Sequence, residues 1–452
     1  MSASVRAEDS SVFPRLLDWP YPNVERGDGV WLFDTDGGRI LDACSGGAMV
    51  TSLGHHVPEL VAAAAAQADA IAYMYNHHFT SDAQERLAGR LIDVVAPEMA
   101  RVRLVSGGSE ANETALRLAR SYHVERGDSD RWRVITQAQA YHGSTMGTLA
   151  LSGRRSLQEP YTPYLASHLH LPPATWRTDP TGEAALDELD RALEEAGPET
   201  VAAYFCEPVS AAALPGHSPP ERFWRGLAER RERHGFLVCF DEVVTGVGRV
   251  GTWLAAHQVS IAPDIVSVGK GLGAGHAPLG AVLCTAEVYD ALDRGSRQFD
   301  LGHTWDGAPL PSAVGMAAID LLVERRLVDQ VAERGPALLA DLQAAVAGCE
   351  IVREVRGRGF LLGVELVDPR DGTSLLPDQV DAADVVDRTA LEQGLLVMST
   401  HSTRDGYTGD HTLLAPAFTA TDAELAEMVE RFAATIGDAE LAIKQALPDG
   451  TS

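Results

Sequence analysis

Short runs of β-forming residues alternate with helical segments through the middle of the chain, and this alternation restricts the fold more than any other feature. The runs end at polar or glycine-rich turns, as the strands of a buried sheet do. We expect strands at residues 101–105, 133–136, 201–206, 236–240 and 264–268, and helices at 109–123, 184–195 and 223–233. Strands separated by helices favour an α/β domain with a mostly parallel central sheet.

The two ends of the chain follow other patterns. Residues 29–41 predict a β-hairpin, because β-forming residues flank the turn sequence Asp36-Gly37-Gly38, and residues 58–72 predict an alanine-rich helix. In the C-terminal part we expect helices at 315–327 and 328–347, strands at 351–356 and 360–366, a helix at 382–393, a strand at 395–398 and a last helix from 422. That order is typical of a smaller α+β domain.

Charge and composition exclude several classes of protein. The chain has 64 acidic and 37 basic residues, so its formal net charge is −27, which disfavours binding to nucleic acid or to anionic lipid. We find no signal-peptide core at the start and no run of about 18 apolar residues, so we expect a cytoplasmic protein without a membrane span. The five cysteines are widely spaced and form no CxxC pair, which fits free thiols better than disulfides or a metal site.

Lysine is scarce in this chain. Only Lys270 and Lys444 are lysines among the 37 basic residues, so chemistry that needs an amine has two candidate positions. Lys444 lies in a helical pattern of alternating polarity and is expected to be solvated. Lys270 follows the apolar run 264–268 and lies between two glycines, a position suited to an amine activated by partial desolvation.

Two further motifs accompany Lys270. The sequence Ser-Gly-Gly-Ser-Glu-Ala-Asn at 106–112 follows a strand, and we expect Ser109 to cap the next helix, whose free N–H groups can bind phosphate. Alone, this motif is more often an ordinary capped helix. Asp241 ends the run 236–240, and ligands of α/β sheets gather at the carboxyl ends of strands. A phosphate cradle, a strand-end carboxylate and a strand-end lysine together match what pyridoxal phosphate requires.

These motifs and their order resemble the class III aminotransferases, which are fold-type I pyridoxal phosphate enzymes. The resemblance covers about residues 25–435 and rests on SGGSEANETALRLAR from 106, YHG from 141, CEPV from 206, DEVVTGVGRVGTW from 241, VGKGLGAGHAPLGA from 268, GHTWDG from 302 and LLAPAFTATDAE from 413. It implies a large cofactor-binding domain at 76–315 and a small domain built from residues 1–75 and 316–452.

The resemblance also implies roles for individual residues in binding pyridoxal 5'-phosphate. Gly108 and Ser109 would contact the cofactor phosphate. Tyr141 would stack on one face of the ring and Val243 on the other, while Asp241 would pair with the pyridine nitrogen. Without the resemblance, Tyr141 would be interpreted as ordinary core packing.

Four other residues complete the expected site. Lys270 would form the Schiff base and move the proton, and His142 and Glu207 would lie beside the cofactor. Thr304 would reach the phosphate bound by a neighbouring subunit, so the resemblance implies a homodimer with shared active sites; assembly into a tetramer is left open. From the residues alone, we would interpret His142 as a buried structural histidine and Thr304 as a helix cap.

The substrate is less restricted by the sequence than the cofactor. Relatives commonly use an amine distant from a carboxylate, so we expect an ω-amino acid or primary amine donor and a keto acid acceptor such as pyruvate or 2-oxoglutarate, by ping-pong transamination. Tyr75, in the aromatic and histidine segment 73–79, and Arg404, as the partner of a substrate carboxylate, are the candidate substrate-binding residues. Departures from the family pattern bear on the substrate and not on the cofactor; they lie at Ser106, Ser210–Leu214, Trp305, Asp306 and Ala417.

Two alternatives to transamination remain at this point. The same cofactor and lysine can serve a decarboxylase, a racemase or an aminomutase. A non-catalytic binding module with the same fold is the second alternative, but the presence of both Lys270 and Asp241 argues against it.

Overall fold

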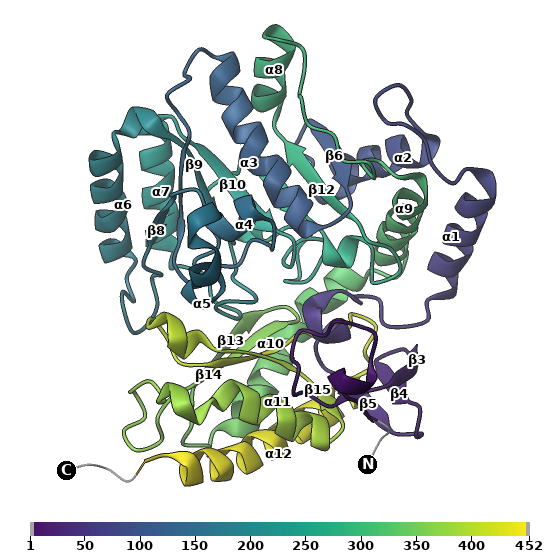
Figure 1. Cartoon of the computed structure of the whole chain (residues 1–452), viewed down its shortest axis with the longest axis vertical. Helices are drawn as coiled ribbons and strands as arrows, with labels where there is room; N and C mark the ends of the chain where they lie inside the picture. The colour runs from purple at the N-terminus through teal and green to yellow at the C-terminus, as the bar shows by residue number, and fades with distance from the viewer. Residues whose placement is uncertain (1–3, 449–452) are drawn as a thin grey trace.

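The computed structural model describes residues 4–448 and divides into a large domain and a smaller one beside it (Figure 1). The large domain is built on a seven-stranded sheet with the order β6-β12-β11-β10-β9-β7-β8. The strands are β6 (Arg101–Val105), β7 (Arg133–Gln137), β8 (Leu169–Leu171), β9 (Val201–Cys206), β10 (Leu237–Glu242), β11 (Ile265–Val268) and β12 (Gly280–Cys284). β12 is antiparallel to both of its neighbours, while the strands from β11 to β8 are parallel, which confirms the mostly parallel sheet.

Helices cover both faces of this sheet, so its central strands are buried throughout (Figure 1). Along β10, Leu237 and Cys239 pack in the cluster that contains α3 and α8, whereas Val238 and Phe240 pack in the cluster that contains α6 and α7. This follows from the period of two along a strand. The helices of this part are α1 (Pro58–Ala70), α2 (Asp82–Arg90), α3 (Gly108–Glu125), α4 (Met146–Leu151), α5 (Arg155–Gln158), α6 (Glu183–Ala196), α7 (Glu221–His234), α8 (Ala286–Arg294) and α9 (Pro309–Glu324).

The small domain combines segments from both ends of the chain. One sheet has the order β13-β14-β17-β16 and the other β15-β5-β4-β3, in which β15 pairs in parallel with β5. The strands are β3 (Val24–Asp28), β4 (Trp31–Asp34), β5 (Arg39–Asp42), β13 (Val352–Arg358), β14 (Leu361–Leu366), β15 (Leu395–Leu396), β16 (Met398–Thr400) and β17 (His411–Leu414), preceded by the short pair β1 (Ser4–Val5) and β2 (Tyr21–Pro22). The antiparallel pair β4–β5 confirms the hairpin predicted at 29–41.

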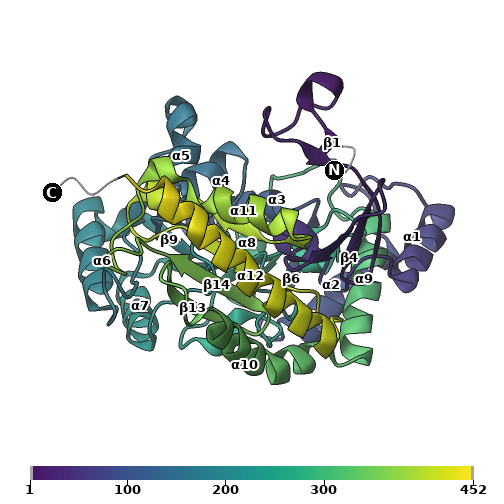
Figure 2. The same ribbon diagram turned by 90° about the horizontal axis from the view of Figure 1, so that it is seen from below.

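Three long helices complete the small domain. They are α10 (Leu327–Val346), α11 (Ala382–Glu392) and α12 (Asp422–Ala446), and Figure 2 shows α12 crossing the outer side of this domain against α10 and α11. Within residues 4–448, no helix combines the length and the apolar character needed to cross a membrane.

The helix expected at 315–327 begins earlier than predicted, at Pro309. Proline is favoured in the first turn of a helix, where its missing N–H group has no intrahelical acceptor. Gly315 does not begin the helix but lies within it, where a Cβ atom would come within 2.5 Å of Leu279 Cδ2. The same helix crosses the predicted boundary at 315/316, and α1, from the segment assigned to the small domain, packs against it. The domain boundaries therefore stay predictions.

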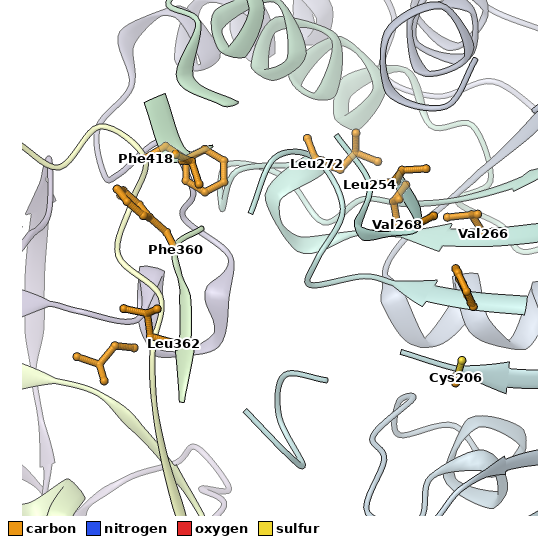
Figure 3. Close-up of a cluster of buried hydrophobic side chains, with 14 of the residues drawn as sticks. Cys206, Leu254, Val266, Val268, Leu272, Phe360, Leu362 and Phe418 are labelled. Atoms are coloured by element: carbon orange, nitrogen blue, oxygen red, sulfur yellow. The ribbon is translucent and has the colours of Figure 1, made fainter. Parts of the chain in front are cut away.

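One hydrophobic cluster runs through both domains (Figure 3). Leu254, Val268 and Leu272 of the large domain belong to the same buried cluster as Phe360 and Phe418 of the small domain. The domains therefore share part of their core, and the orientation of one relative to the other is fixed by packing.

Arg249 joins the two domains inside this junction. Its side chain is buried, and its guanidinium donates hydrogen bonds to the main-chain oxygens of Phe360 at 3.2 Å and Pro416 at 2.6 Å and to Ser45 Oγ at 3.1 Å. Burial lowers the pKa of this guanidinium to about 10, which leaves it charged at neutral pH. The charge is compensated by neutral oxygen acceptors on three distant segments.

We predict that Arg249→Leu lowers the free energy of unfolding by about 2–3 kcal/mol, because buried oxygens lose their donors. Urea unfolding followed by tryptophan fluorescence measures the change. Arg225→Leu is the matched control, because its ion pair with Glu221 is exposed to solvent and is expected to change stability much less. Equal midpoints for the two variants would contradict this role for Arg249.

Candidate active site

A cavity of about 160 Å³ lies at the carboxyl edge of the central sheet. Its walls come from the start of α3 and from the chain that follows β7, β9, β10 and β11, because parallel strands end at the same edge. The lining residues are Gly108, Ser109, Asn112, Tyr141, His142, Gly143, Glu207, Ala212, Asp241, Val243, Val244 and Lys270. The structure thus brings together all of the predicted cofactor-binding residues except Thr304.

The carboxylate of Asp241 is buried and held by three hydrogen bonds. Oδ2 lies 2.7 Å from Asn112 Nδ2 and 2.8 Å from His142 Nδ1, and Oδ1 accepts the main-chain N–H of Val243 at 3.0 Å. These partners fix the orientation of the carboxylate and compensate its removal from water.

His142 supports Asp241 and also lines the cavity. Its ring lies edge-on to Phe205 with centroids 5.0 Å apart, and Nε2 is 3.4 Å from Thr136 Oγ1. The main-chain N–H donates to Ser152 Oγ at 2.8 Å. His142 is thus buried, as a structural histidine would be, and it also lies in the cavity wall, as the predicted neighbour of the cofactor would. Its role in binding the cofactor stays a prediction.

Lys270 follows β11 by two residues and reaches the cavity from the strand beside Asp241. Its backbone has φ = +42°, a left-handed conformation that a lysine rarely adopts. Desolvation lowers the pKa of its ammonium group, and Asp241 and Glu207 oppose that shift. A lowered pKa increases the share of neutral amine, the form that acts as a nucleophile or a base.

Glu207 follows β9 and forms the wall of the cavity beside Lys270. Burial raises the pKa of its carboxyl group to about 7, with a smaller contribution from Asp241. Its oxygens accept hydrogen bonds from Ser210 Oγ at 3.1 Å and from the main-chain N–H of Ala211 at 3.0 Å. The unusual segment Ser210–Leu214 therefore begins with groups that hold Glu207 in place.

The start of α3 forms the other wall. A Cβ atom on Gly108 would lie 2.6 Å from Val243 Cγ1, and one on Gly143 would lie 2.6 Å from Ser109 Oγ, so both close approaches require glycine. The predicted helix cap is wrong: Gly107 is the N-cap, and Ser109 Oγ accepts the N–H of Ser144 at 3.1 Å. Gly108 and Ser109, in the first turn of α3, still line the cavity, and the first N–H groups of a helix can bind an anion.

Glu242, the second acid after the strand, does not line the cavity. It is fully buried and accepts hydrogen bonds from the main-chain N–H groups of Ala255 and Ala256, each at 2.7 Å, and from Thr245 Oγ1 at 2.7 Å. Burial raises the pKa of its carboxyl group to about 7. Of the two adjacent acids, Asp241 belongs to the cavity and Glu242 holds the loop that follows.

Three predicted residues lie outside this cavity. Tyr75 is 54% exposed and stacks on His77, with ring centroids 5.6 Å apart. The guanidinium of Arg404 donates to Asp378 Oδ1 at 2.8 Å and lies 3.6 Å from Asp381 Oδ2. Thr304 is exposed in a turn before α9. The roles of all three in binding stay predictions.

Asn112 is a site residue that the sequence analysis did not assign. It lies one turn after Gly108, so it falls on the same face of α3. That spacing, together with the glycine turn, is a signal from which its position could have been inferred. Its Oδ1 atom is buried and has no hydrogen-bond partner among the described residues, so one polar group in the wall is available to a ligand.

The residues present fit pyridoxal phosphate. Asp241 has a fixed carboxylate that suits a protonated ring nitrogen, and Lys270 has the required amine. Tyr141 and Val243 have side chains on which a flat ring can pack. Gly108, Ser109 and Gly143 line the cavity at the start of α3, where a phosphate can meet helix N–H groups.

Comparisons with known proteins agree with this geometry. The family model described as aminotransferase class-III matches residues 17–436. An uncharacterized aminotransferase of Bacillus subtilis is 31% identical over 95% of this chain and 98% of its own. Among solved structures, an amine transaminase of an uncultivated Pseudomonas species in its PLP-bound form has a TM-score of 0.86 at 32% identity, covering 95% of this chain and 97% of that one. An (S)-enantioselective omega-transaminase from Thermomicrobium roseum has a TM-score of 0.86 at 30% identity and covers 93% of each chain.

The raised pKa of Glu242 predicts a pH dependence of stability. The folded protein holds a proton on this group at pH values where the unfolded chain has released it, so the contribution of Glu242 to stability is fully present below pH 4.5 and is lost as the pH rises through 7. We expect the stability of wild type relative to Glu242→Gln to fall by about 2–3 kcal/mol from pH 5 to pH 8. Urea unfolding at several pH values measures this, and a difference independent of pH would contradict it.

Proposed function

The chain belongs to the class III aminotransferases, a family of pyridoxal phosphate-dependent transaminases, and on that premise we propose that it is a cytoplasmic, homodimeric ping-pong transaminase. Its donor is an ω-amino acid or a primary amine, and its acceptor is a keto acid such as pyruvate or 2-oxoglutarate. The observation that carries this proposal is the presence of Lys270 and an anchored Asp241 in one cavity.

Pyridoxal 5'-phosphate, when bound, supplies a carbonyl for the donor amine and a ring that accepts negative charge. Lys270 would hold its carbonyl carbon and Asp241 its ring nitrogen. Tyr141 and Val243 would enclose the ring, and the N–H groups of Gly108 and Ser109 would face the phosphate.

The chain's own residues then have separate tasks. Lys270 Nζ, with its lowered pKa, would accept the proton from the donor carbon and deliver it to the carbon that was the cofactor's carbonyl carbon. Asn112 and His142 keep Asp241 Oδ2 in one orientation during that transfer. Glu207, whose pKa is about 7, offers a protonated or ionised oxygen on the substrate side of the cavity.

Two observations support the proposed donor class. The solved structures that resemble this chain include an amine transaminase and an omega-transaminase. In addition, Ala212 lines the cavity where the segment after Glu207 departs from the family pattern, so a small apolar side chain faces the substrate. The first favours an amine donor, and the second favours an apolar group next to the reacting carbon.

The proposed homodimer is supported by an exposed aromatic surface. Trp305 is 58% exposed and meets Tyr73 edge-on at 5.7 Å between centroids, and Tyr75 and Phe79 are also exposed. Large exposed apolar groups in one region are typical of protein interfaces. Thr304 adjoins this surface in sequence, as its proposed contact with the neighbouring phosphate requires; tetramer formation stays open.

We predict that Lys270→Ala loses the visible absorbance of the bound cofactor and lowers the transamination rate by at least about 10³-fold, because both the covalent anchor and the proton carrier are removed. Lys444→Ala is the matched control, since it removes the only other lysine, which is exposed and paired with Glu440. A Lys270→Ala spectrum identical to wild type would refute the assignment.

A second experiment distinguishes transamination from the other reactions of this cofactor. Purified enzyme is incubated with panels of donors and keto acids, and the amine formed from the acceptor is quantified. We expect one molecule of acceptor to be aminated for each molecule of donor consumed, and we expect turnover with ω-amino acids or primary amines. Exclusive use of α-amino donors, or release of carbon dioxide without an aminated acceptor, would contradict the proposed reaction.

A further inference from the structure

Arg154 is a largely buried cation with little compensation. Its side chain is 13% exposed, and no hydrogen bond joins its guanidinium to another residue within 4–448. The nearest carboxylate is that of Asp405, whose Oδ2 lies 3.8 Å from Nε, and both of these atoms are buried without a hydrogen-bond partner. A buried guanidinium is normally bound to several acceptors, so this arrangement leaves donor groups available.

The backbone places Arg154 beside the cavity wall. Gly153 exchanges main-chain hydrogen bonds with Gln139 at 3.2 Å and Ala140 at 2.9 Å, and a Cβ atom on Gly153 would collide with the backbone of residues 137–139. Tyr141, which lines the cavity, follows this pair directly. The backbone at Gly153–Arg154 thus lies against the segment that leads into Tyr141, on that side of the site.

The other basic side chains near the site are held by acceptors or, for Lys270, assigned to the cofactor. Among the described residues that line the cavity, Lys270 and His142 are the basic ones, and His142 is bound to Asp241. Arg249 donates to oxygens at the domain junction, and Arg404 is held by Asp378. A keto acid or an ω-amino acid carries a carboxylate that needs a counter-charge when it leaves water.

We propose that Arg154 is the residue that binds the substrate carboxylate, which makes it a specificity-determining residue for carboxylate-bearing donors and acceptors. This inference rests on the proposed function. Asp405, which is anchored by the main-chain N–H of Arg155 at 3.2 Å, is the countercharge of Arg154 when no carboxylate is bound. Simple amines and aldehydes leave the Arg154–Asp405 pair in place.

The first test measures binding without turnover. The probe is glutarate, a dicarboxylate that cannot be transaminated, and its Kd for the cofactor-loaded enzyme is measured by calorimetry. We expect Arg154→Gln to raise the Kd by about 10–100-fold and Arg154→Lys to raise it less, because hydrogen bonds to a charged group are lost. Arg155→Gln, which changes the exposed neighbouring arginine, is the matched control and should leave the Kd unchanged.

The second test compares acceptors. Arg154→Gln should raise the KM for pyruvate by about 10-fold or more and change the KM for propanal, which lacks the carboxylate, by less than about 3-fold. Equal effects on both acceptors, an unchanged glutarate Kd, or loss of glutarate binding in Arg404→Gln instead would each overturn the inference. Because glutarate binding needs no reaction, failure of the proposed transamination would be seen separately, as absence of turnover in the wild-type enzyme.

Discussion

The anchoring of the Asp241 carboxylate is the interaction on which the rest of the site depends. A carboxylate removed from water is costly unless its oxygens are hydrogen-bonded, and the partners here come from α3, from the segment after β7 and from the end of β10. The same bonds that compensate the charge therefore also join the elements that form the cavity. Lys270 projects from the adjacent strand, so the register of β10 against β11 sets the distance between the acid and the amine.

The junction between the two domains holds a segment that lines the Asp241–Lys270 cavity. Arg249 joins Ser45, Phe360 and Pro416 through one buried guanidinium, and a shared hydrophobic cluster surrounds it. The segment after Glu207 rests on the small domain, where Arg356 Nε donates to the oxygen of Pro215 at 3.1 Å. The segment after Glu207 is thus held in place by packing between the domains.

Much of the centre could be predicted from the sequence. The scarcity of lysine singled out Lys270, and the ends of apolar strands indicated Asp241, because both features are local. The prediction that Ser109 caps the helix was wrong, since its hydroxyl instead accepts the N–H of Ser144 from a segment 35 positions away. Asn112 was not assigned for the same reason: its function depends on a contact with Asp241 across 129 positions.

The sequence by itself determined the alternation of strands and helices, the chemistry available at strand ends and the family of the chain. These depend on the period of apolar residues and on residue types, which are properties of short segments. Only the tertiary structure decided which of the adjacent acids faces the cavity, that Arg404 is held by Asp378, and that Arg154 is largely buried opposite Asp405 without a hydrogen bond to it. The reason is physical: the orientation and pairing of a charged side chain depend on the segments that remove it from water, and those segments are distant in the chain.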